Sequence, residues 1–204
     1  GITYHDIDRI FFTHNHPDHM CDLIPFLFGS RYQLDARKKD LEIVAGPGFQ
    51  DFFDKLMAAF KHWLKPTEYK LNILEIDEGV YEFESLKVQV GKVKHIAMSR
   101  GYRFTNDRGK SVALSGDTDY CKGMIELGRG ADLMVLECAW PDEEKSEGHL
   151  GPTLAGKLAA EADCKKICLT HFYPPCDLGN ILKKVQDIYT GELVLARDLM
   201  QFEL

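Results

Sequence analysis

Short apolar runs alternate along the chain with longer stretches in which apolar residues recur at helical spacing. The short runs are rich in β-branched residues and predict strands, whereas the longer stretches predict amphipathic helices. Such alternation is typical of an α/β layered domain. The expected strands include residues 7–12, 41–45, 133–137, 166–169 and 192–195, and the expected helices are 22–37, 49–63, 120–127, 153–162 and 178–189.

The middle of the chain has a different hydrophobic pattern, because short strand-like runs follow one another without a helical stretch between them. The tetrapeptide Asn106-Asp107-Arg108-Gly109 has the composition of a hairpin turn. We therefore expect an antiparallel or mixed sheet here. Its strands are predicted at residues 71–76, 81–83, 86–93, 101–105 and 111–114.

One predicted helix, residues 49–63, carries large apolar side chains at intervals of three and four. This spacing puts them on one face of a helix, where they are expected to form core and not a cofactor pocket. The side chains are Phe49, Phe52, Phe53, Leu56, Phe60 and Trp63.

The length of 204 residues, of which 45% are hydrophobic, fits one globular domain over residues 1–204. No apolar run is long enough to cross a bilayer, and the N-terminus lacks the layout of a signal peptide. The six cysteines form no Cys-x-x-Cys pair, which favours reduced thiols. We therefore expect a soluble cytoplasmic protein without a membrane partner.

The net charge of −7 means that the whole molecule repels polyanions, so any nucleic-acid contact must be local. The basic residues that could form such a patch fall in two groups along the chain. An ordinary solvated surface of mixed charge is the alternative reading of both groups. They are Arg31, Arg37, Lys38 and Lys39, followed by Lys92, Lys94, Arg100, Arg103, Arg108 and Lys110.

The candidate chemistry begins with three histidines, His14, His16 and His19, which directly follow the predicted strand 7–12. A loop at a strand end can turn several side chains together over the edge of a sheet. Imidazole nitrogens suit Zn²⁺, and the His-x-His spacing lets two ligands reach one ion. Asp18 and His19 can then turn towards a second ion. A polar turn with accidental histidines is the competing interpretation.

Further ligands are needed for two ions, and suitable residues follow three other predicted strands. His95 follows strand 86–93, Asp117 follows strand 111–114, and His171 follows strand 166–169. Each residue alone has an ordinary explanation as a surface histidine or a turn aspartate. Their repetition in one structural context predicts that they converge.

Five segments of the chain carry a recognisable pattern. They are Thr13-His14-Asn15-His16-Pro17-Asp18-His19, Gly101-Tyr102-Arg103 after His95, Ser115-Gly116-Asp117-Thr118, Gly148-His149-Leu150 and Leu169-Thr170-His171. These segments resemble the metallo-β-lactamase superfamily, and specifically its ribonuclease Z-like phosphodiesterase branch. The resemblance covers the chain almost end to end and implies a four-layer αββα sandwich.

The resemblance implies two Zn²⁺ ions per chain, with Mn²⁺ or Fe²⁺ as alternatives. It assigns His14, His16 and His95 to one ion, Asp18, His19 and His171 to the other, and Asp117 to a bridge between them. It also implies that His149 is not a ligand but donates a proton. A hydroxide shared by the metals would attack the phosphorus of a phosphodiester, and Asp18 would assist as a base.

The chain departs from the family at its start, where relatives have several strands before the histidine-rich loop. We therefore expect the sandwich without its first N-terminal strands, and a homodimer formed through the uncovered sheet edge. The long basic arm of transfer-RNA processing members is also missing between Asp22 and His95. Together with the negative charge, this favours a small or nucleotide phosphodiester over RNA as the substrate.

Two other functions remain open on sequence alone. The same metal pair could hydrolyse a lactone, a thioester or another carbonyl compound, because hydroxide attacks either kind of centre. A protein of a different class would keep the metals only for folding. A purely structural zinc site is normally closed by four ligands, which argues against that second alternative.

Overall fold

The computed structural model describes residues 1–32 and 34–204. It comprises two compact units, Gly1–Asp77 and Glu78–Leu204. No helix in the described part of the chain combines the length and the apolar character that a membrane span requires.

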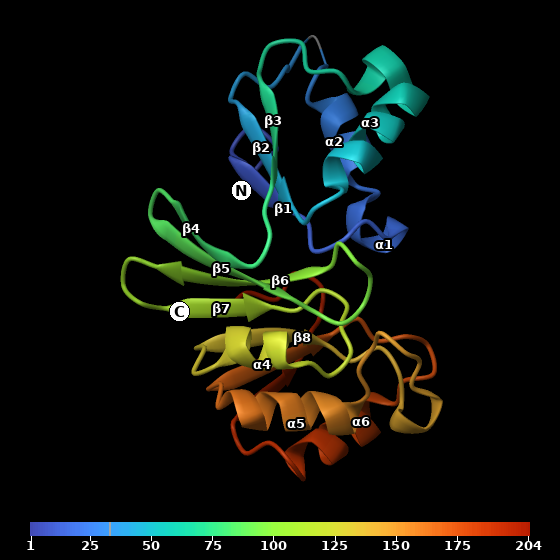
Figure 1. The fold of residues 1–204 in the computed structure, drawn as a ribbon, viewed down its shortest axis with the longest axis vertical. Helices are drawn as coiled ribbons and strands as arrows, with labels where there is room; N and C mark the ends of the chain where they lie inside the picture. The colour runs from blue at the N-terminus through green and yellow to red at the C-terminus, as the bar shows by residue number, and fades with distance from the viewer. Residues whose placement is uncertain (33) are drawn as a thin grey trace. The chain divides into compact units, whose positions relative to one another are not determined.

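The first unit is built on a three-stranded parallel sheet in the order β1-β2-β3 (Figure 1). Parallel neighbours need crossover connections, and helices supply them here. The central strand β2 is the most buried of the three, as expected for a strand with a neighbour on each side. The elements are β1 (Arg9–Phe11), α1 (Pro17–Met20), α2 (Leu23–Gly29), β2 (Leu41–Ala45), α3 (Phe49–Phe60), the 3₁₀ helix η1 (Lys61–Leu64) and β3 (Leu71–Glu75).

The helix predicted over residues 22–37 is wrong in length, because α2 ends at Gly29. Glycine is a poor helix former, and the chain beyond it is held by a different contact. The backbone N–H of Arg37 donates to the carbonyl of Ser30 over 2.8 Å and closes a loop. Gln33, which the prediction included, lies outside the described residues.

The apolar stripe predicted for residues 49–63 is only partly core. Phe49 and Phe53 are buried, but Phe60 is 38% exposed and Trp63 is 53% exposed. The reason is that α3 ends at Phe60, and Lys61 takes a positive φ of 53° before the 3₁₀ turn. The helical spacing therefore stops, and Trp63 no longer shares the buried face.

Arg37 was one of the basic residues considered for a nucleic-acid contact, and the structure excludes that role because the side chain is fully buried. Its guanidinium donates to the backbone carbonyls of Tyr4, Ile7 and Asp40. It also lies over the ring of Tyr69. Arg37 thus fastens the N-terminal segment to the loop before β2. Arg100 is buried in a similar way in the second unit.

The second unit contains a seven-stranded sheet in the order β10-β9-β8-β7-β6-β5-β4. Its strands β4 to β7 pair in antiparallel fashion, whereas β7 to β10 are parallel, which confirms the expected mixed sheet. The predicted turn at residues 106–109 does join β6 to β7. The strands are β4 (Gly79–Phe83), β5 (Leu86–Lys92), β6 (Arg100–Asn106), β7 (Ser111–Leu114), β8 (Leu133–Glu137), β9 (Lys166–Thr170) and β10 (Glu192–Leu195).

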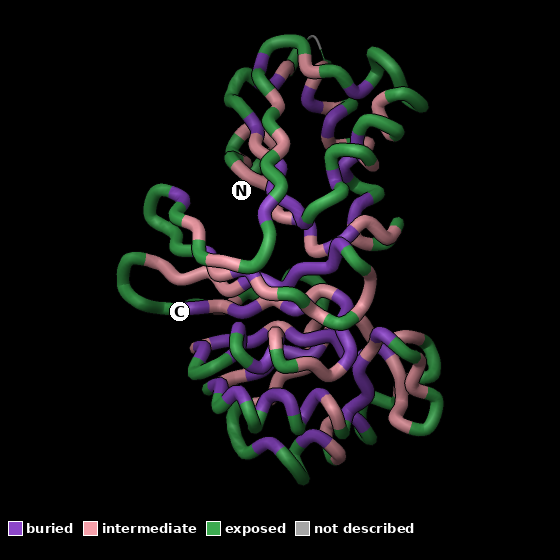
Figure 2. Tube along the Cα trace, in the orientation of Figure 1, coloured by how far each residue is buried: buried purple, intermediate pink, exposed green. Residues whose placement is uncertain are grey.

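Three helices pack on this sheet, α4 (Lys122–Gly128), α5 (Pro152–Ala162) and α6 (Leu178–Gln186), and a 3₁₀ turn, η2, covers Asp142–Glu144. The helices lie on the same side of the sheet (Figure 1). Their inner faces form one apolar cluster with β7, β8 and β9. Figure 2 shows the buried residues concentrated in these strands and in the inward faces of the helices. This packing gives the second unit a rigid core on which strand ends can hold functional side chains.

Strand direction decides where the functional residues of the second unit lie. Strand β5 runs in the same direction as β7, because each is antiparallel to β6, and β7 is in turn parallel to β8 and β9. The carboxyl ends of these four strands therefore lie along one edge of the sheet. The segments that follow them carry the polar side chains described next.

Candidate metal centre

In the first unit, the segment after β1 brings the contiguous group of candidate ligands together. His16 is extended and Pro17 starts α1, so the backbone turns sharply between His14 and His19. The ring of His14 lies 4.7 Å from that of His16 and 4.2 Å from that of His19, measured between centroids. The carboxylate of Asp18 lies 3.1 Å from Nε2 of His19. Four side chains with metal-binding atoms thus share one turn of the chain.

In the second unit, three candidate ligands converge from three separate strand ends. Asp117 follows β7 and is only 2% exposed. One of its oxygens, Oδ2, lies 3.7 Å from Nε2 of His95, and the other, Oδ1, lies 3.6 Å from Nε2 of His171. His171 reaches this position with a left-handed backbone, at a φ of 63°. Asp117 therefore offers a different oxygen to each imidazole.

The chemistry of this donor set fits divalent metal ions. Two ligand atoms that each lie 2.0–2.1 Å from a tetrahedral zinc ion are about 3.3 Å apart. The spacings from Asp117 to His95 and to His171 are close to this value and too long for good hydrogen bonds. Imidazole and carboxylate together suit zinc and related metals. The residues present therefore fit the metal ions that the sequence predicts.

The orientation of His95 also favours a ligand role. Its Nδ1 donates to the carbonyl of Gly148 over 3.0 Å, since a carbonyl can only accept. The proton is thereby placed on Nδ1, and Nε2 keeps the lone pair that faces Asp117. Gly148 has a φ of 84°, and a Cβ there would come within 2.8 Å of that Nδ1. Only glycine fits this position without a shift of His95.

His149 lies beside these residues and is held by a carboxylate that sequence reasoning missed. Glu137, the last residue of β8, is 1% exposed and lies 2.9 Å from Nδ1 of His149. Its oxygens also accept from the backbone N–H groups of Thr118, Ala139 and Leu150. The hydrogen bond to Glu137 raises the pKa of His149, and burial opposes this effect. A histidine held in this way is suited to carry a proton.

Aromatic rings flank the two histidines of the second unit. The ring of Tyr173 lies 5.1 Å from that of His171 and 6.0 Å from that of His149. Trp140 packs edge-on against Tyr173 at 5.1 Å. Sequence reasoning missed both residues, although each follows soon after a predicted strand. The ring of Tyr173 therefore places apolar surface beside His149 and His171.

The predicted site residues are thus divided between the two units. The first unit groups His14, His16, Asp18 and His19, and the second groups His95, Asp117, His149 and His171 with Glu137. Each group is compact within its own unit.

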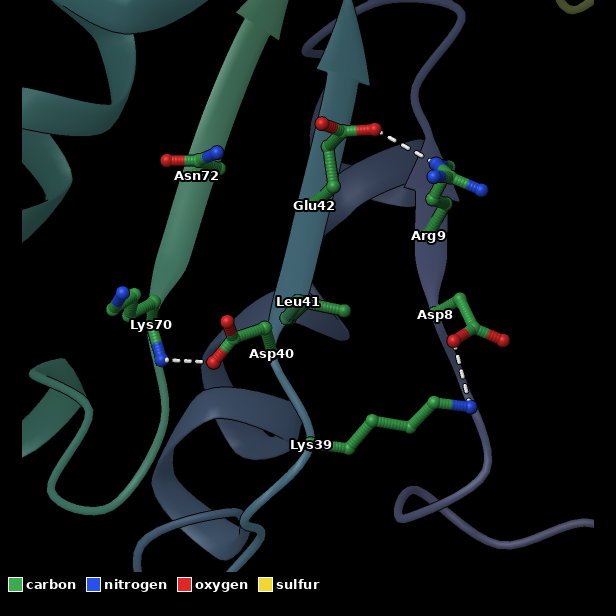
Figure 3. A pocket seen from close by; sticks show the side chains of 8 residues that line it. All are labelled: Asp8, Arg9, Lys39, Asp40, Leu41, Glu42, Lys70 and Asn72. Atoms are coloured by element: carbon green, nitrogen blue, oxygen red, sulfur yellow. Dashed lines mark hydrogen bonds and ion pairs between the residues drawn. The ribbon is translucent and has the colours of Figure 1, made fainter. Parts of the chain in front are cut away.

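A separate polar hollow of about 280 Å³ lies where β1, β2 and β3 begin (Figure 3). The segment with His14 to His19 follows the other end of β1. Its charged groups are largely paired with one another. Arg9 contacts Glu42 at 2.7 Å, and Lys39 contacts Asp8 at 2.6 Å. The carboxylate of Asp40 accepts from the backbone N–H of Lys70. These pairs connect the strand starts and explain the hollow without a ligand.

Comparison with known proteins places the chain in a family. Residues 2–172 match a family model described as a beta-lactamase superfamily domain. An uncharacterized protein of Mycobacterium bovis is 29% identical, over 90% of this chain and 68% of its own length. Ribonuclease Z of Brevibacillus brevis is also 29% identical, over 95% of this chain and 78% of its own length.

Solved structures agree on the fold. The metallo-beta-lactamase fold protein YhfI from Bacillus subtilis superimposes with a TM-score of 0.80 at 23% identity, covering 95% of this chain and 76% of that one. The short form of human tRNase Z superimposes with a TM-score of 0.71 at 24% identity, and the match covers 98% of this chain and 80% of that one. The chain therefore belongs to the beta-lactamase superfamily, a superfamily of metal-dependent hydrolases, and has the metallo-β-lactamase fold.

Proposed function

We propose that this chain hydrolyses a phosphodiester with the help of two bound zinc ions, and that residues 1–204 are one functional domain. The proposed ligands are the seven residues predicted from the sequence. They are His14, His16, Asp18, His19, His95, Asp117 and His171. The observation that carries the proposal is the buried carboxylate of Asp117, which presents one oxygen to each of two histidines.

Two bound divalent cations would lower the pKa of a water molecule and offset negative charge on the substrate. The side chains of the protein provide the remaining functions. Asp18 is assigned as a ligand and also as a base that assists the attacking water. Its carboxylate is exposed, so the water molecule that attacks the substrate can reach it.

His149 is assigned as the proton donor to the leaving group. Glu137 accepts from Nδ1, which leaves Nε2 to hold the transferable proton. The same hydrogen bond raises the pKa of His149 and so favours the protonated form that a donor needs. In hydrolysis, the bond from phosphorus to the leaving oxygen breaks, and that oxygen takes the proton from His149.

The relatives support the phosphodiester over other substrates, because several of the similar sequences are named ribonuclease Z. A small or nucleotide phosphodiester is preferred to a long RNA. The reason is the net charge of −7, which opposes the binding of a polyanion.

The test combines elemental analysis with a substrate panel. We expect two zinc ions per chain and turnover of bis(p-nitrophenyl) phosphate. An acyl lactone and a thioester serve as the comparison substrates. Turnover of only these two would replace the phosphodiester by a carbonyl substrate, and a metal-loaded protein that turns over none of the three would contradict the proposed activity.

A further inference from the structure

Asp119 lies two residues beyond Asp117, where three segments of the second unit meet. Its backbone N–H donates to the carbonyl of Lys94 over 2.7 Å. Lys94 directly precedes His95, and its own N–H donates to the hydroxyl of Thr118. The backbone of Asp119 therefore ties the segment after β7 to the segment after β5.

The side chain of Asp119 reaches a third segment, the one that carries His149. One carboxylate oxygen lies 3.0 Å from Nζ of Lys145, and the other accepts from the backbone N–H of Gly148 over 3.4 Å. The backbone N–H of Tyr120 and the ammonium of Lys94 also donate hydrogen bonds to this carboxylate. Asp119 and Gly148 are buried and the side chain of Lys145 is only 19% exposed, so the contacts between them are largely shielded from salt. The contact with the exposed Lys94 is not shielded in this way. The carboxylate thus holds the segment 145–148 at both of its ends.

Gly148 connects this carboxylate to the candidate metal centre. Its N–H points to Asp119, whereas its carbonyl accepts from Nδ1 of His95. His149 is the next residue in the chain, so a movement of Gly148 moves the backbone from which its imidazole projects.

We propose that Asp119 is a positioning residue, which holds Lys145 and Gly148 so that His149 presents Nε2 to the leaving group. This inference rests on the proposed function of His149. Asp119 itself touches neither the substrate nor the transferred proton. Its removal should therefore reduce proton donation without removing the donor.

The same unit offers a matched carboxylate for comparison. Asp132 accepts from Nζ of Lys165 over 2.8 Å and from the backbone N–H of Ser111 over 2.9 Å. A second lysine, Lys110, lies 3.4 Å from the same carboxylate. Asp132 therefore resembles Asp119, because each carboxylate contacts two lysines and accepts from the backbone. It precedes β8, whereas the candidate centre lies beyond the carboxyl end of that strand. If the role of Asp119 were purely structural, Asp119→Asn and Asp132→Asn should have the same effects in the measurements below.

The test uses two substrates that differ only in the leaving group, methyl p-nitrophenyl phosphate and methyl phenyl phosphate. The phenyl ester needs proton donation, because phenolate is the poorer leaving group. For Asp119→Asn we expect kcat for the phenyl ester to fall about 10-fold to 100-fold, with a smaller loss for the nitrophenyl ester and little change in KM. Lys145→Met should show the same selectivity to a lesser extent, and it serves as the second variant if Asp119→Asn folds poorly.

The control Asp132→Asn should leave the ratio of the two kcat values unchanged. Equal losses on both esters in Asp119→Asn and in Lys145→Met would overturn the positioning role. So would an unchanged kcat in both variants accompanied only by a lower melting temperature.

Amide hydrogen exchange provides a readout that does not depend on activity. The N–H of Gly148 should exchange faster in Asp119→Asn than in the unmodified protein, and Asp132→Asn should not change it. If the unmodified protein hydrolyses neither ester, the proposed function fails, and the exchange rate of Gly148 still decides whether Asp119 holds the segment. Unchanged exchange at Gly148 would overturn the inference.

Discussion

The two units collect their candidate ligands in different ways. In the first unit, one turn between β1 and α2 supplies four residues that are neighbours in sequence, from His14 to His19. In the second unit, His95, Asp117 and His171 come from the ends of three strands, 76 positions apart from first to last (171 − 95 = 76). Local backbone geometry is sufficient for the first group, whereas the second depends on the order and direction of the strands.

This difference predicts that substitutions in the two groups reduce activity and metal binding to different extents. The largest loss is expected from a substitution of Asp117. Asp117→Asn removes the charge that faces both His95 and His171, so we expect activity to fall roughly 1,000-fold or more and both metals to be lost. His16→Asn should remove one metal and reduce activity less. Enzyme assays with metal analysis of both variants test this order, and two metals retained in Asp117→Asn would contradict it.

Next in size are substitutions that leave the ligands intact but change His149. His149→Ala should lower kcat about 100-fold or more, because general acid catalysis is lost. Glu137→Gln should lower kcat to a smaller extent, since it weakens the hydrogen bond that orients Nδ1 of His149. Metal content should stay unchanged in both. Loss of metal from His149→Ala would show that this histidine is a ligand and not a donor.

In the first unit, a stability effect of about 3 kcal/mol is expected from Arg37→Met. The change leaves three partly buried carbonyls, of Tyr4, Ile7 and Asp40, without their donor. Urea unfolding measures the loss, and the exposed neighbour Lys38→Met is the matched control, with an expected change of less than about 0.5 kcal/mol. Equal effects of the two substitutions would mean that Arg37 does not fasten the N-terminal segment.

The smallest expected effect depends on pH and concerns Asp132 in the second unit. Its hydrogen bond with Lys165 and that with the N–H of Ser111 lower the pKa of this carboxyl. A carboxyl with a lowered folded-state pKa contributes its full stability above the unfolded-state pKa of about 4. The contribution then decreases as the pH falls from about 4 towards the lowered folded-state pKa. Asp132→Asn should therefore cost about 1 kcal/mol at pH 7 and clearly less near pH 2. Unfolding curves at both pH values give the comparison, and a pH-independent loss would argue against this origin.

The same contrast explains what could be predicted from the sequence. The histidine-rich turn was visible because its members are adjacent, and most strands were placed within one or two residues of their observed ends. Glu137 was missed because one acidic residue at the end of an apolar run looks like the ordinary start of a loop. Its importance depends on the return of the chain at His149 and Leu150, a non-local contact that spacing alone does not reveal.

The errors in the first unit have a local cause that periodicity does not detect. The apolar spacing in residues 22–37 and 49–63 continues beyond the points where the helices end. The backbone of Ser30 is bonded to Arg37, and Lys61 has a positive φ, so each helix is interrupted. Gly29 was a residue-type signal for the first interruption, whereas no residue type indicated the second, and Trp63 was consequently assigned to the core.

The placement of the two tryptophans gives each unit its own optical reporter. Trp63 is half exposed in the first unit, whereas Trp140 is partly buried against Tyr173 in the second. Fluorescence from Trp63 should be quenched readily by iodide in solution, and emission from Trp140 should be shielded and sensitive to the surroundings of His149. With single Trp→Phe variants, unfolding of the two halves can be followed separately in the same molecule.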